Sequence, residues 1–160
     1  MINIFKKGFT LIELLIVIAI IGILTALVTT NLSGARSRAR DTRRKSDLRS
    51  IEQSLRLYYN DAKKFPTDDG SDNISIASWG SPFAVGSTIY MSSLPKDPIS
   101  TATSTVTYKY DSLGDDKYLI IAVLENASDP DIAESQLKCT SNYSSYIGVK
   151  TTTDYLVCAQ

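Results

Sequence analysis

An apolar run of twenty residues, Phe9 to Val28, restricts the folding of this chain more than any other part of its sequence. Its clearly polar side chains are those of Thr10, Glu13 and Thr25. As an α-helix rising about 1.5 Å per residue, the run would be about 30 Å long, which matches the hydrocarbon core of a bilayer. Branched aliphatic residues lie on all sides of this helix, unlike on an amphipathic surface helix. We therefore expect a membrane-spanning helix.

A cleaved secretory signal is the main alternative, because Lys6 and Lys7 precede the run. The apolar core of such a signal is usually about 7 to 15 residues long and ends at an A-x-A-like site. Here the run is longer, and the residues after Val28 read TTNLSGA, which contains no such site. We therefore prefer a helix that is retained in the chain.

Charge divides the sequence into a basic first part and an acidic second part. Residues 1–64 contain 12 Lys and Arg against 5 Asp and Glu, and residues 65–160 contain 5 against 12. The chain has no histidine, which excludes His-dependent catalytic triads and His-ligated zinc. Because no nucleophile, acid and base converge in the pattern, we expect a protein that is neither an enzyme nor a cofactor binder.

A second helical pattern follows the polar patch Thr29–Gly34. One face of the segment is apolar, with a spacing of three or four residues, and we expect the helix to resume there and to run to Lys64, before Pro66. The apolar positions are Leu48, Ile51, Leu55, Tyr58 and Ala62.

The same segment carries the basic run RSRARDTRRKSDLR, residues 36–49, which would suit contacts with phosphates. Asp41 and Asp47 interrupt it, and no aromatic residue lies within it to stack on bases. We therefore expect a solvated or subunit-facing helix surface and no nucleic-acid partner. After a membrane span, so many arginines would place their own side in the cytoplasm, which is at odds with an exported C-terminal part.

The rest of the chain predicts a small antiparallel sheet. Residues 65–104 are rich in Ser, Asp, Gly, Thr and Pro and predict a long connecting loop with small local elements. A first strand is predicted where Val106, Tyr108 and Tyr110 alternate with polar residues, and a turn is expected over Asp111–Asp116. The segment Lys117–Leu124 consists almost entirely of apolar residues and predicts a central strand. Two further short strands are expected, at Tyr146–Val149 and Tyr155–Cys158. With the preceding helix, this predicts an α+β fold.

The acidic second part of the sequence raises two questions, whether its cysteines form a disulfide and whether its acidic residues bind a metal ion. Cys139 and Cys158 would form one disulfide in an exported domain, or remain two free thiols in a reducing compartment. Acidic residues near the predicted strand ends also raise the question of a calcium ion, but their spacing matches no EF-hand loop, and we expect no metal. These residues are Asp115, Asp116, Glu125, Asp129 and Asp131.

The stretch KGFTLIEL, residues 7–14, resembles the processing site of type IV prepilins and of type II secretion pseudopilins. The resemblance implies a leader of residues 1–8, cleavage between Gly8 and Phe9, and methylation of the new amine of Phe9 by a membrane prepilin peptidase. It further implies an assembly helix over 9–30, a stem helix over 31–64 and a head over 65–160 that closes with a disulfide loop. The implied fold is pilin-like, with the long helix packed on the small sheet.

The resemblance also gives Glu13 a role. A carboxylate in a membrane-spanning segment is costly and needs a partner. In this family the glutamate is thought to pair with the N-terminal amine of a neighbouring subunit, here that of Phe9. The implied partners are identical or related subunits, an inner-membrane assembly platform and, before assembly, lipid. The implied location is the bacterial inner membrane, with the head outside the cytoplasm, and then an extracellular or periplasmic filament.

Two features leave the type of filament open. Pilins commonly have a proline at the position of Thr30, so a helix kink here would need another cause. The segment LPKDP, residues 94–98, resembles the head of major pseudopilins, whereas the cysteine pair is more similar to the disulfide loop of a pilus-forming pilin. We expect a pilus subunit for adhesion, motility or DNA uptake, with a secretion pseudopilin as the alternative and a monomeric, membrane-anchored binding domain as a third interpretation.

Overall fold

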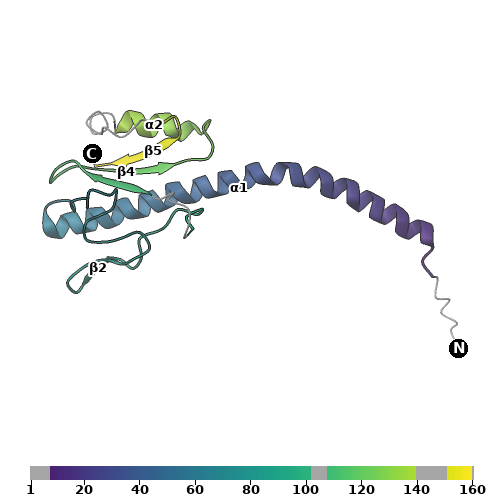
Figure 1. Cartoon of the computed structure of the whole chain (residues 1–160), viewed down its shortest axis with the longest axis horizontal. Coiled ribbons are helices and arrows are strands. Elements are labelled where there is room, and N and C mark those ends of the chain that lie inside the picture. Colours follow the sequence, from purple (N-terminus) through teal and green to yellow (C-terminus); the bar gives the residue numbers. More distant parts are fainter. Residues whose placement is uncertain (1–7, 102–107, 140–150, 160) are drawn as a thin grey trace. The chain divides into compact units, whose positions relative to one another are not determined.

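The computed structural model describes residues 8–101, 108–139 and 151–159, with only the backbone described for residues 27–31. The chain divides into two compact units, residues 1–37 and residues 38–160. Helix α1, Leu11–Ala62, contributes its first half to one unit and its second half to the other. The fold is α+β, with this long N-terminal helix and small antiparallel sheets (Figure 1).

The polar patch Thr29–Gly34 does not interrupt α1, so the expectation that the helix stops and resumes there was wrong. Hydroxyl groups near the patch bond back to helix carbonyls, as Thr25 does to Ile21 and Ser37 does to Gly34, and are thereby satisfied without breaking the helix. The helix ends at Ala62, two residues before the expected end, and Lys63 adopts a positive φ of 57°. Within the described part of the chain, no helix has both the length and the apolar character needed to cross a membrane.

The head unit, residues 38–160, contains a three-stranded antiparallel sheet. Its strands are β3, Lys109–Ser112, β4, Tyr118–Val123, and β5, Asp154–Cys158, in the order β3-β4-β5. The central position expected for the apolar strand is therefore confirmed for β4. The turn between β3 and β4 is shorter than predicted, because β3 continues to Ser112. The predicted strand at Tyr146–Val149 and the residue Val106 lie outside the described residues.

The sheet is covered on both faces, by the second half of α1 and by the short helix α2, Pro130–Lys138 (Figure 1). Alternate residues of β4 point to opposite faces. Those facing α1 join one buried cluster, which includes Leu48, Ile51, Leu55, Tyr118, Ile120 and Ala122. Those facing the other way join a second cluster, formed by Leu119, Ile121, Leu156 and the two cysteines.

One helix of the head was not expected from the sequence, and the small elements expected within the predicted loop form a hairpin. Helix α2 begins at the N-cap Asp129, whose side chain accepts a hydrogen bond from the backbone N–H of Asp131, and Pro130 occupies a first-turn position. A hairpin of β1, Phe83–Val85, and β2, Thr88–Met91, lies inside the predicted long loop.

Candidate functional site

The first half of α1 exposes its apolar side chains on every side. From Phe9 to Leu24, the large hydrophobic residues are between 46% and 83% exposed. They are Phe9, Leu11, Ile12, Leu14, Leu15, Ile16, Val17, Ile18, Ile20, Ile21, Ile23 and Leu24. Soluble monomers rarely expose so much contiguous apolar surface, so a surface of this kind marks a site of contact with protein or lipid.

The carboxylate of Glu13 is held by the residue just before the helix. The backbone N–H and the hydroxyl of Thr10 both donate to its Oε2, each at 2.8 Å, and the backbone N–H of Glu13 donates to the Thr10 hydroxyl at 3.3 Å. This reciprocal arrangement is a capping box, with Thr10 as N-cap and Glu13 three residues later. Our sequence interpretation missed the role of Thr10, although the T-x-x-E spacing before an apolar run is its recognised signal.

The residues expected to be processed stand next to this cap. Phe9 is 81% exposed, and a side chain added at Gly8 would meet no atom within 4 Å. Gly8, Phe9 and Glu13 thus lie within one short, exposed stretch at the beginning of α1. The fourth expected feature, the cysteine pair, belongs to the head unit and is not part of this stretch.

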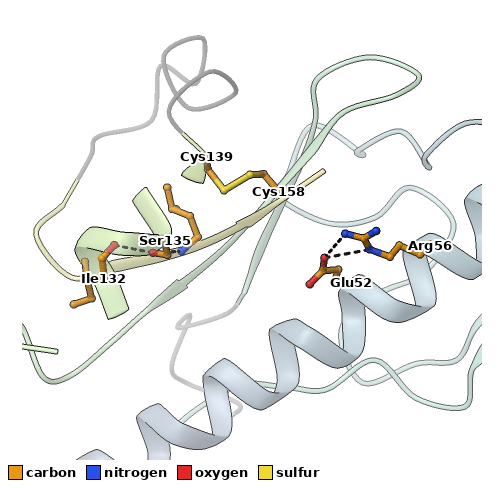
Figure 2. The surroundings of a disulfide bond; sticks show 7 residues. Glu52, Arg56, Ile132, Ser135, Cys139 and Cys158 are labelled. Carbon is orange, nitrogen blue, oxygen red and sulfur yellow. Dashed lines mark hydrogen bonds and ion pairs between the residues drawn. A yellow bond between two sulfur atoms is a disulfide. The ribbon is translucent and has the colours of Figure 1, made fainter. Parts of the chain in front are cut away.

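Cys139 and Cys158 form a disulfide with a Cα–Cα distance of 5.8 Å. Cys139 is the C-cap of α2 and Cys158 is the last residue of β5, so the bond ties the end of the helix to the strand beneath it (Figure 2). Hydrogen bonds join the same two elements, from the Leu156 N–H to the Ser135 hydroxyl at 3.2 Å and from the Gln136 amide to the Asp154 carbonyl at 2.9 Å.

The basic run of α1 was expected to be a solvated or subunit-facing surface, but one of its residues, Arg44, is completely buried within the head. Its guanidinium group donates to Asp97 at 2.6 and 3.0 Å, to Asp41 at 2.6 Å and to Glu125 at 2.9 Å. Asp41 in turn accepts the backbone N–H groups of Glu125 and Asn126. Arg44 therefore ties α1 to two other segments of the head, and Asp97 belongs to the LPKDP segment noted in the sequence.

Three of the five acidic residues considered for calcium, Glu125, Asp129 and Asp131, are instead paired with cations of α1. Arg40 also binds Glu125, and together with Arg44 it holds the pKa of that carboxyl down at about 2. Lys45 binds Asp129 at 2.6 Å and Asp131 at 2.7 Å. Among the described residues, no group of three or more potential ligand side chains is arranged to hold a metal ion.

These pairs give three residues of the basic run, Arg40, Arg44 and Lys45, partners within the head unit. Several charges of the run are neutralised by the acidic second part of the chain. An interaction of this kind could not be recognised from the run itself, because its partners are about 50 to 85 residues away in the sequence.

Comparisons with known proteins relate the chain to a family of known subunits. Residues 5–29 match the family model described as the prokaryotic N-terminal methylation motif. The type II secretion system core protein G of Escherichia coli is 35% identical over 96 residues, 58% of this chain and 66% of the relative. The protein of the same name from Vibrio cholerae is 32% identical over 114 residues, 69% of this chain and 73% of the relative.

A pilus protein is also similar to part of the chain. The type IV wide pilus major component PilA4 of Thermus thermophilus is 50% identical over 72 residues, 45% of this chain and 47% of the relative. No solved structure matches the chain. The matched segment thus spans about half of the Thermus thermophilus protein and about two thirds of the Escherichia coli protein.

An exposed apolar helix that begins with a methylation motif, followed by a helix-backed antiparallel sheet, defines a class of filament subunits. The chain belongs to the family of type IV pilins and type II secretion pseudopilins.

Proposed function

We propose that this chain is a structural subunit that polymerises through the first half of α1 into a pilus-like filament and has no enzymatic activity. The observation that carries the proposal is the exposure of every large apolar side chain from Phe9 to Leu24, in a chain whose head buries its own core. Such a helix needs surroundings that the single chain does not provide. Lipid provides them before assembly, and the same helices of other copies provide them in the filament.

The proposal includes processing at the beginning of this helix. A prepilin peptidase removes residues 1–8 by cutting between Gly8 and Phe9, and the new Phe9 amine is methylated. The exposure of this stretch is consistent with access by an enzyme. Before assembly, residues 9–30 span the inner membrane with the head outside the cytoplasm, and an inner-membrane platform then moves the subunit into the filament.

Glu13 would then set the register between neighbouring subunits. Two atoms of Thr10 hold Oε2 of Glu13, so the carboxylate is fixed at the first turn of α1, four residues from Phe9. Cleavage creates a cationic amine at Phe9, and the amine of an adjacent copy is the partner that a carboxylate in an apolar environment requires. Between apolar helices in lipid, a polar contact of this kind selects one offset where dispersion forces alone would not.

The filament we propose is a surface pilus, and the disulfide is the observation that supports this choice. A fibre exposed outside the cell benefits from a head whose last strand is covalently tied to α2. The second candidate is a pseudopilus of a type II secretion system. It is supported by the core protein G relatives and by the LPKDP segment, which Asp97 anchors to Arg44.

Mass spectrometry of the mature chain and electron microscopy of sheared filaments would test the proposal. We expect a mature N-terminus at methylated Phe9, and filaments composed of this chain. A membrane protein that still begins at Met1, with no filaments, would contradict the proposal and favour a monomeric anchored domain. Loss of enzyme export in a deletion strain, without loss of surface filaments, would replace the pilus by the secretion role.

A further inference from the structure

The head unit has a hollow near the C-terminal end of α1. It measures about 420 Å³ and is formed by the last turns of α1, the chain just after them, the turn between β3 and β4, and the beginning of β4. The side chains that matter for its chemistry are those of Arg56, Tyr59, Asn60, Phe65, Asp116 and Tyr118.

The hydroxyl group of Tyr118 is the first sign that this hollow receives a ligand. Tyr118 is completely buried, yet among the described residues its hydroxyl has no hydrogen-bond partner. Two other buried tyrosines of the head do have partners, since the Tyr108 hydroxyl donates to Asp47 at 2.7 Å and the Tyr110 hydroxyl donates to the Pro66 carbonyl at 2.6 Å. A buried polar group without a partner is costly and rare in native proteins. A molecule that enters the hollow and bonds to this hydroxyl would remove that cost.

Three more side chains of the lining have unused hydrogen-bonding atoms. Asn60 is exposed, and its amide forms no hydrogen bond with a described residue. Asp116 accepts the Tyr59 hydroxyl through Oδ1 at 2.6 Å, which leaves Oδ2 available. Arg56 donates to Glu52 from Nε at 3.2 Å and from Nη2 at 2.8 Å, which leaves Nη1 available (Figure 2). The hollow thus offers donors and acceptors side by side.

The charges around the hollow favour a neutral ligand. Arg56 is already paired with Glu52, so an incoming anion would meet two carboxylates, those of Glu52 and Asp116, beside the one guanidinium group. An incoming cation would meet that guanidinium group beside Asp116. Like charges brought together at a binding site are costly, and neither kind of ion finds a site of purely opposite charge here.

Aromatic rings form the apolar part of the lining. The centroid of the Phe65 ring lies 4.6 Å from that of Tyr59 and 4.6 Å from that of Tyr118, so the three rings are contiguous. Small-molecule sites of proteins combine an apolar or aromatic wall with a few polar groups that fix the orientation of the ligand. The volume of the hollow also falls within the range of about 300 to 1,000 Å³ that is typical of such sites.

We infer that this hollow binds a neutral saccharide. Each hydroxyl group of a sugar both donates and accepts hydrogen bonds, which suits a lining that combines a phenol, an amide, a carboxylate and a guanidinium group. Tyr118, Asn60 and Asp116 bind the sugar hydroxyls, and the partly exposed ring of Tyr59 packs against the apolar C–H face of the sugar. The inference goes beyond the proposed function, because it concerns the head unit alone and requires no filament.

Saturation-transfer NMR on the full-length chain, in micelles of a detergent without a sugar headgroup, tests the site. The probes are the methyl glycosides of glucose, galactose, mannose and N-acetylglucosamine. We expect transfer to the ring protons of at least one probe, and Asn60→Ala and Tyr118→Phe should each weaken its binding at least about fivefold. Gln53→Ala removes an exposed amide of α1 outside the hollow, and as the matched control it should leave binding unchanged.

Thermal unfolding separates a ligand-binding hydroxyl from a structural one. Tyr118→Phe should not lower the unfolding midpoint of the unliganded chain, because the hydroxyl that it removes has no partner among the described residues. Tyr108→Phe should lower the midpoint, since it removes the donor to Asp47.

Three results would overturn the site. They are the absence of transfer to all four probes, equal binding by the wild type, Asn60→Ala and Tyr118→Phe, and a lower unfolding midpoint for Tyr118→Phe. A mature chain that begins at methylated Phe9 and forms filaments would leave the proposed function standing in each case.

Discussion

The two halves of α1 show opposite relations between sequence and burial. In the first half, apolar residues occur on all sides and remain about half to four fifths exposed. In the second half, Leu48, Ile51 and Leu55 recur on one face and are completely buried against the sheet. One continuous helix can therefore depend on other molecules at one end and on its own chain at the other. The periodicity of the apolar residues distinguishes the two ends.

The two units also differ in whether a charged side chain finds a counter-ion within the same chain. In the N-terminal unit, the carboxylate of Glu13 receives hydrogen bonds from Thr10 but no ion pair with a described residue. In the head, the charge of Arg44 is enclosed by three carboxylates of its own chain. The buried charge of the head is thus neutralised within its own chain, whereas Glu13 has no counter-ion among the described residues.

Replacing Glu13 should have the largest effect on assembly and none on the head. Glu13→Leu should insert into the membrane at least as well as the wild type, because it removes a costly polar group from the apolar run. Filaments should be absent or irregular in register, since the helices lose the polar contact that selects one offset. Filament yield and helical parameters by electron microscopy would measure this, and near-UV circular dichroism would monitor the head.

Glu13→Gln separates the two possible roles of this residue. Glutamine preserves the acceptor that caps Thr10, because Gln also forms capping boxes, but it carries no charge for a neighbouring amine. We expect it to fail in assembly nearly as completely as Glu13→Leu. Ordered filaments from Glu13→Gln would mean that Glu13 acts as a cap within its own chain and that the pairing with Phe9 is wrong.

Removing the buried guanidinium should have the largest effect on the head. Arg44→Met leaves Asp41, Asp97 and Glu125 without their common partner, and breaking a buried ion pair in this way costs on the order of 3 to 5 kcal/mol. Denaturant unfolding of the full chain in detergent would measure the loss. Arg43→Met is the control, and its effect should stay within about 0.5 kcal/mol because that side chain is exposed. Equal effects of the two substitutions would contradict the role assigned to Arg44.

Sequence reasoning succeeded where a pattern is local and failed where a partner is distant. The one-sided face of α1 and the apolar strand β4 follow from spacing alone, and both are observed. The burial of Arg44 does not, because Asp97 and Glu125 reach it only through the tertiary fold. Helix α2 had a local start signal, Asp129 followed by Pro130. Among its nine residues only Ile132 and Ser135 are buried, so the sequence has no helical period of apolar residues from which the helix could be predicted.

Loss of the disulfide should loosen one edge of the head. In the chain-entropy model, a loop of this length gives about 3 kcal/mol, so the double variant Cys139→Ser with Cys158→Ser should be destabilised by about 2 to 4 kcal/mol. Hydrogen exchange should increase at the Leu156 amide, which donates to Ser135, before it increases in β4. Membrane insertion should be unchanged. Two alkylatable thiols in denatured, unreduced wild-type chain would show that the bond is absent from the mature protein.

The smallest expected effect is a pH dependence that distinguishes the head from the first half of α1. Bonds from Arg40, and also from Arg44, lower the pKa of Glu125 from 4.5 to about 2 in the folded chain. Because this pKa is lower in the folded chain than in the unfolded chain, the ionised Glu125 stabilises the fold at pH values above about 4.5. As the pH falls from about 4.5 toward 2, the unfolded chain binds the proton first, and this stabilisation is lost. Glu125→Gln should therefore flatten the decrease of unfolding free energy in this window while lowering stability at neutral pH.

Glu134→Gln, in an exposed pair with Lys138 on α2, is the matched control and should change the curve less. If the two substitutions gave the same acid profile, the pairs around Arg44 would contribute no more to the head than an ordinary surface pair, and the electrostatic contrast between the two units would fail.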